Sequence, residues 1–168
     1  VALKDFNGDG LPDSAVVSNS ATGTVSVHLN TTSVSPVSMC TPQNIAVPGQ
    51  HTAIGVGEFD GTSNNDILVT DMNHNKVWLL PDDGAGQFKT PVDFSTGLSP
   101  VALSVGDFNN DALLDFAVAL QDANQVSVRL GNGIGSFGPD LLSLPISGAA
   151  PSALAAADFD LNGNLDLV

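Results

Sequence analysis

The chain of 168 residues has few basic side chains, a single cysteine and no long apolar run. Four Lys and Arg against 18 Asp and Glu give a formal net charge of −14. This balance argues against binding to nucleic acid or to anionic lipid, because both require clustered cations. No run of 18 apolar residues is present, so we expect no membrane insertion. Cys40 has no second cysteine with which to form an internal disulfide.

Motifs of common enzymes are also missing. No Gly-x-Ser-x-Gly element occurs, and His28, His51 and His74 are scattered, without a Cys or second His at zinc spacing. The stretch GIGSFG at 133–138 matches a dinucleotide-binding pattern, but Pro139 follows it and no helix is expected there to hold a pyrophosphate. The sequence therefore predicts no enzyme.

Helical periodicity over three turns is absent, whereas ten prolines and seventeen glycines interrupt short apolar segments. The chain begins without Met and without a basic segment followed by an apolar one, so no signal peptide is visible. A processed or excised chain would have lost such a peptide.

A polar pattern of nine residues is present in four copies. It reads DFNGDGLPD from residue 5, EFDGTSNND from residue 58, DFNNDALLD from residue 107 and DFDLNGNLD from residue 158. One apolar segment precedes each copy and another follows it. The preceding segments are 1–3, 52–57, 101–106 and 152–157, and the following ones are 14–18, 67–70, 116–120 and 167–168. Repetition about every 50 residues predicts a repeat architecture.

A third segment alternates apolar and polar residues, as in TVSVHL at 24–29 and QVSVRL at 125–130, and KVWLLP at 76–81 corresponds to it. Glycine-rich turns at 82–88 and 131–137 follow, and then a further extended piece. A period of two predicts half-buried strands. The repeating unit is therefore predicted to be four short antiparallel strands, with the polar loop between the first and second.

Such a unit cannot bury its own sheet faces, so the units must stack. We expect an all-β chain of β-propeller blades at about 1–48, 49–97 and 98–148, with a partial blade at 149–168. A β-sandwich would not explain why the loop stays at one fixed point of the repeat. Because propellers typically close with 4–8 blades, we expect a fragment of a longer protein or one chain of an assembly. Further blades of the same protein or another chain would complete it.

Oxygen-bearing side chains occupy positions 1, 3, 5 and 9 of the loop, where they can enclose Ca²⁺ together with the carbonyl of position 7. The predicted ligands are Asp5, Asn7, Asp9, Leu11 and Asp13 in the first loop; Asp107, Asn109, Asp111, Leu113 and Asp115 in the third; and Asp158, Asp160, Asn162, Asn164 and Asp166 in the fourth. Gly10 would allow the sharp bend. An EF-hand is excluded because strands flank the loop and Val16 stands where that motif has Glu.

The second loop departs from this pattern and is expected to bind most weakly. Its candidates are Glu58, Asp60, Thr62, Asn64 and Asp66. In all, twelve of the 18 acidic residues lie in the four loops, where three carboxylates per loop repel one another unless a cation neutralises them. An Asp- and Asn-rich turn without metal is the alternative. Fourfold repetition in the same strand context favours a structural calcium site.

Together, DFNGDGLPD, TVSVHL and GNGIGSFG resemble the FG-GAP/VCBS repeat of integrin α-subunits and many bacterial secreted proteins. The resemblance covers essentially the whole chain. It implies a calcium-binding β-propeller, secreted or on the cell surface, that serves adhesion through a protein or glycan ligand. Segment 31–44 departs from the family because it replaces the glycine-rich turn, and a special contact is expected there. Two alternatives are a subunit of a self-assembling surface fibre and an accessory propeller of a secreted polysaccharide-acting enzyme.

Overall fold

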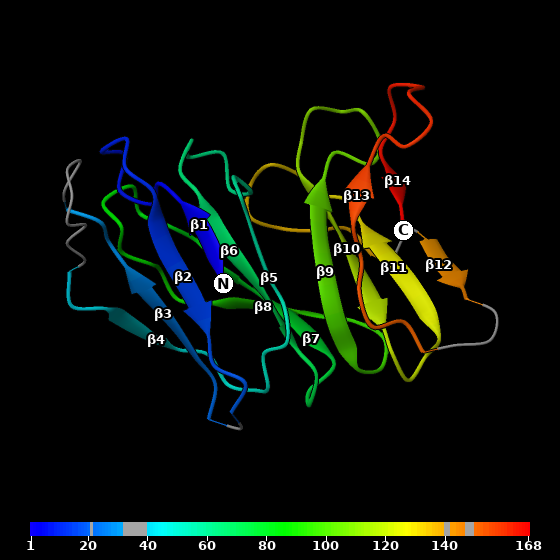
Figure 1. The fold of residues 1–168 in the computed structure, drawn as a ribbon, viewed down its shortest axis with the longest axis horizontal. Coiled ribbons are helices and arrows are strands. Elements are labelled where there is room, and N and C mark those ends of the chain that lie inside the picture. The colour runs from blue at the N-terminus through cyan, green and yellow to red at the C-terminus, as the bar shows by residue number, and fades with distance from the viewer. Residues whose placement is uncertain (21, 32–39, 140–141, 147–149) are drawn as a thin grey trace.

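The computed structural model describes residues 1–20, 22–31, 40–139, 142–146 and 150–168, and the regular structure in these residues is β-strand (Figure 1). The first sheet contains β1 (Ala2–Lys4), β2 (Asp13–Val17), β3 (Thr24–His28) and β4 (Gln43–Ala46). The second contains β5 (Ile54–Gly57), β6 (Asp66–Asp71), β7 (Lys76–Leu80) and β8 (Val92–Ser95). The third contains β9 (Pro100–Gly106), β10 (Asp115–Leu120), β11 (Gln125–Arg129) and β12 (Leu142–Pro145). A shorter sheet pairs β13 (Ala156–Ala157) with β14 (Asp166–Leu167).

Strand order in each sheet follows the chain, and every neighbouring pair is antiparallel. The sheets stand side by side, with the polar loops of the four repeats along one edge, at the top of Figure 1. The predicted all-β fold of four-stranded antiparallel blades is therefore confirmed. The exact blade limits stay a prediction. The described residues contain no helix long and apolar enough to cross a membrane.

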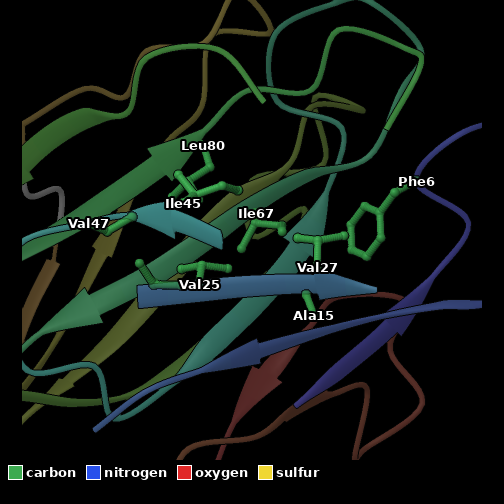
Figure 2. Packing of buried hydrophobic residues seen from close by; sticks show 9 residues of the cluster. Phe6, Ala15, Val25, Val27, Ile45, Val47, Ile67 and Leu80 are labelled. Carbon is green, nitrogen blue, oxygen red and sulfur yellow. The ribbon is translucent and has the colours of Figure 1, made fainter. Parts of the chain in front are cut away.

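Buried side chains fill the spaces between sheets. One cluster joins Val25, Val27 and Ile45 of the first sheet to Ile67 and Leu80 of the second (Figure 2). A second cluster joins Leu68 and Leu79 of the second sheet to Phe116 and Val118 of the third. Every residue of β6 and of β10 is buried. The apolar runs ILV in β6 and FAVAL in β10 are what strands covered on both faces require.

Two elements differ from the sequence-based expectation. A fourth strand of the first repeat, β4, begins at Gln43, within the segment 31–44 that gave no strand pattern. Strand β13 spans only Ala156–Ala157 of the apolar segment 152–157, and the preceding Ala155 exchanges two further backbone hydrogen bonds with Val168. Residues 32–39, on which the predicted special contact largely falls, lie outside the described part of the chain.

Candidate metal centre

The carboxylate at position 1 organises the backbone of its own loop. Asp5 accepts hydrogen bonds from the backbone N–H groups of Asn7 at 3.2 Å, Gly8 at 2.8 Å and Gly10 at 2.8 Å. Asp107 likewise accepts from Asp111 at 3.1 Å and Ala112 at 2.8 Å. Slight desolvation raises the pKa of Asp5 and of Asp107, but the backbone donors outweigh it and lower both below the ordinary value. Both side chains therefore favour the charged form that a cation needs.

All four loops share a left-handed backbone at positions 4 and 6, whatever residues stand there. Position 6 has φ of 83° at Gly10, 66° at Ser63, 69° at Ala112 and 89° at Gly163. The bend predicted from Gly10 is confirmed, and it recurs where no glycine is present. The four loops therefore share the same backbone turn at these two positions.

The Asp at position 9 has a structural role that the sequence pattern did not reveal. Asp115 is fully buried; its Oδ2 accepts from the backbone N–H of Phe108 at 2.8 Å and its Oδ1 from that of Gly131 at 2.9 Å. The same two bonds recur at Asp13, with Phe6 and Asn30, and at Asp66, with Phe59 and Asp82. In the fourth loop Asp166 accepts from Phe159 at 3.0 Å. This carboxylate joins the loop to the end of the third strand, and each oxygen keeps a lone pair for a metal.

Burial makes a negative charge on the Asp at position 9 electrostatically unfavourable. Desolvation raises the pKa of Asp66 to about 6, against the lowering effect of the Asp82 and Phe59 donors, and repulsion from Asp60 and Glu58 adds to the rise. Desolvation also raises the pKa of Asp115, with contributions from Asp111 and Asp107. A bound cation would relieve both the repulsion and the loss of solvation.

Two loops bring three carboxylates close together. The trios are Glu58, Asp60 and Asp66, and Asp158, Asp160 and Asp166; in each, ligand oxygens lie within 4.8 Å of one another. Among the described residues, these are the two trios of acidic side chains that come this close. Both have an acid at position 3.

The first and third loops have Asn at position 3, and their third acid is at position 5. There the oxygens of Asp9 accept from Leu11 N at 2.8 Å and from Asn7 Nδ2 at 3.2 Å. Asp111 is bound in the same way by Leu113 N and Asn109 Nδ2, at 2.8 Å each. The carboxylates of Asp9 and Asp111 are thus hydrogen-bonded within their own turns. That the second loop binds most weakly stays a prediction, although its carboxylates are among those that converge.

The remaining predicted ligands also lie in the turns. Thr62 donates its hydroxyl to Asp60 Oδ1 at 2.5 Å, and Asn162 Oδ1 accepts from Asn164 N at 2.8 Å. Asn64 packs against the glycine-rich turn at Gly84. The side-chain atoms predicted to coordinate the metal are all oxygens, which are hard ligands. Leu11 and Leu113 offer backbone carbonyl oxygens. This chemistry fits Ca²⁺.

Sequence reasoning missed three residues that connect the loops to their surroundings. Asn65 Nδ2 donates to the backbone carbonyl of Asp5 at 2.8 Å, and Asn110 Nδ2 donates to Asn164 Oδ1 at 2.6 Å. Lys89 Nζ lies 3.1 Å from Asp60 Oδ2. One weak indication of the last contact was present in the sequence: Lys89 is one of only four basic residues and directly follows the glycine-rich turn.

Comparison with known families finds the FG-GAP-like repeat twice, at residues 58–118 and 107–168. These stretches together span the second, third and fourth polar loops. A comparison with curated proteins finds no match.

Proposed function

Because the chain belongs to the FG-GAP-like repeat family, we propose that it is a calcium-binding β-propeller module of a secreted or cell-surface protein. The observation that carries the proposal is the convergence of three carboxylates in the second loop and three in the fourth, within a loop repeated four times. A divalent ion is the simplest way to neutralise such a trio. The role of Ca²⁺ here is structural, and no catalytic role is proposed.

When bound, Ca²⁺ would supply charge neutralisation and coordination at the point where the first strand of a repeat meets the second. The carboxylates at positions 1 and 9 stand at the two ends of the loop, as Asp158 and Asp166 do. An ion shared between them fixes the loop ends relative to each other. Since such an ion binds the folded chain in preference to the unfolded one, it adds to stability by mass action.

Calcium titration by calorimetry, with thermal melting in calcium and in chelator, tests this function. We expect bound calcium and a melting temperature that is higher in calcium. Asp160→Asn removes one charge from the fourth trio and should reduce the bound calcium, whereas Asp122→Asn, an exposed residue outside the loops, should not. Identical melting in both buffers, together with no calcium found by elemental analysis, would refute the proposal.

We also propose that further strands complete the short β13–β14 sheet as a full blade beside the third sheet. A hollow of about 310 Å³ there is lined by Phe108, Val128, Leu130, Leu144 and Leu165, among others. The corresponding phenylalanines of earlier repeats are covered: Phe88 packs on Phe6 with ring centroids 5.8 Å apart, and Phe137 on Phe59 at 5.6 Å. This pattern supports an aromatic residue of a following glycine-rich turn as the occupant of the hollow.

Native mass measurement over a range of concentrations tests whether the same polypeptide or a second copy of this chain completes that blade. We expect a monomer, because the proposed occupant belongs to the same polypeptide and not to a second copy of this chain. A stable oligomer of this chain would instead favour the surface-fibre alternative.

A role in adhesion, through a protein or glycan ligand, is part of the proposal. Binding of the calcium-loaded chain to a glycan array and to cell-surface protein is the measurement that checks it.

A further inference from the structure

Lys89 places a fixed positive charge at the second loop. Its Nζ lies 3.1 Å from Asp60 Oδ2, and its side chain is half exposed whereas that of Asp60 is only 12% exposed. The backbone N–H of Lys89 donates to the carbonyl of Pro81 at 2.8 Å, which anchors the residue beside the turn. The ammonium group is therefore held against an acid that belongs to the trio Glu58, Asp60 and Asp66.

The other repeats differ at this point. In the third repeat Gly138 follows Phe137 in the place where Lys89 follows Phe88, so no side chain is available there. In the fourth loop, Asp158, Asp160 and Asp166 take part in none of the three ion pairs found among the described residues. Within the described part of the chain, one of the two close trios is thus paired with a lysine and the other is not.

We propose that Lys89 is a tethered counter-ion that partly replaces Ca²⁺ in the second loop and opposes its binding there. This inference rests on the proposed calcium-binding function. In the absence of calcium, the ammonium group offsets repulsion among the three carboxylates. When calcium binds, the same group repels the ion and competes for Asp60. The second loop should therefore keep its shape at calcium concentrations at which the fourth loop is empty.

Lys89→Gln tests the inference, and Lys76→Gln is the matched control. Lys76 pairs with Asp93 at 2.7 Å in the same repeat but away from the polar loops, so its substitution makes the same change in net charge. Calcium titration by calorimetry should show about threefold to tenfold tighter binding at one site of the Lys89→Gln protein, the range expected from removing one partly screened charge near a divalent ion. The control should bind calcium as the unmodified chain does.

Melting in chelator provides a second readout. The rise in melting temperature from chelator to calcium should be larger for Lys89→Gln than for Lys76→Gln, because in chelator the three acids of the second loop then lack a cation. Taking the rise within each variant cancels the contacts that Lys76 makes with Asp93 and Trp78. Adding Asp60→Asn removes the acid that holds Lys89 at the loop, so Lys89→Gln should tighten calcium binding less in that background. Both effects together support the tethered counter-ion.

The outcomes separate the two proposals. If the unmodified chain binds calcium but Lys89→Gln binds it equally or more weakly, the counter-ion is refuted while calcium binding stands. Weaker binding would make Lys89 a residue that positions Asp60 instead. If no variant binds calcium, the proposed function and this inference both fail.

Discussion

The carboxylate of Asp115 accepts the backbone N–H of Gly131 at 2.9 Å, and this bond ties the start of β10 to the residues that follow β11. The other oxygen of Asp115 accepts the N–H of Phe108. One buried side chain thus satisfies two donors from different parts of the repeat. The arrangement does not require a metal, so it can be tested without one.

Asp115→Ala should lower the free energy of unfolding by about 2–4 kcal/mol in chelator, because it leaves two part-buried N–H donors without their acceptor. Urea denaturation measures the loss. Asp122→Ala is the control and should cost much less, because this carboxylate is exposed and accepts one hydrogen bond, from the Ser99 hydroxyl. A loss for Asp115→Ala that appeared only with calcium present would show that the carboxylate acts solely as a ligand.

Stability without calcium should depend on pH through Asp66. Its pKa is about 6 in the folded chain, above the ordinary value of 3.8, so the folded state holds this proton more tightly than the unfolded state does. The stabilisation from protonation is complete below about pH 4 and is lost as pH rises through about 6. Denaturation curves from pH 4 to 7 should show this trend in the unmodified chain.

Asp66→Asn provides the comparison, because its amide carries no charge at any of these pH values. The difference in unfolding free energy between the two proteins should change with pH by about 1–3 kcal/mol. Parallel curves would mean that Asp66 titrates alike in both states. With calcium, the dependence reverses: the ion requires the ionised carboxylate, so binding at the second loop should weaken below about pH 6.

Ala112→Gly should stabilise the third loop. Ala112 has φ of 69°, which is strained for a residue with a Cβ, whereas the corresponding Gly10 and Gly163 adopt such angles freely. We expect a gain of about 0.5–1 kcal/mol, measured as a higher melting temperature. Ala46→Gly, at an exposed position in β4, should instead destabilise the protein. A loss of stability for Ala112→Gly would mean that the alanine side chain makes a contact of its own.

Phe137→Ala should weaken the packing between the second and third sheets. It should therefore reduce stability more than a substitution at an exposed position does. The ring of Phe137 lies 4.7 Å from that of Phe116, 5.1 Å from that of Phe94 and 5.6 Å from that of Phe59, measured between centroids. Its removal should reduce the unfolding free energy by about 3–5 kcal/mol. Ile134→Ala in the same turn is the control, since its side chain is 76% exposed. Equal effects of the two substitutions would contradict the packing role.

The strands and loops whose positions depend on repetition and on local periodicity could be predicted from the sequence. Alternation in TVSVHL and QVSVRL located β3 and β11, and the apolar runs after each loop located β6 and β10. The nine-residue pattern indicated the loops and the residues that form them. These features depend on residues that are close together in the chain, so their pattern is visible in a single sequence.

Contacts between distant residues could not be read in this way. Asn65 and Asp5 are 60 residues apart, and Lys89 and Asp60 are 29 apart, and nothing in the local pattern pairs them. The structural use of Asp115 was hidden because the same residue type also suits a metal ligand. A fourth strand was predicted for each repeat, but the position of β4 was not located because its sequence, QNIA, is short and follows an irregular segment.

Ile67 and Leu68 are consecutive in β6, yet one belongs to the core shared with the first sheet and the other to the core shared with the third. A single peptide bond therefore connects two separate cores. Melting of β6 would open both at once, so the first three sheets should unfold as one cooperative unit and not sheet by sheet.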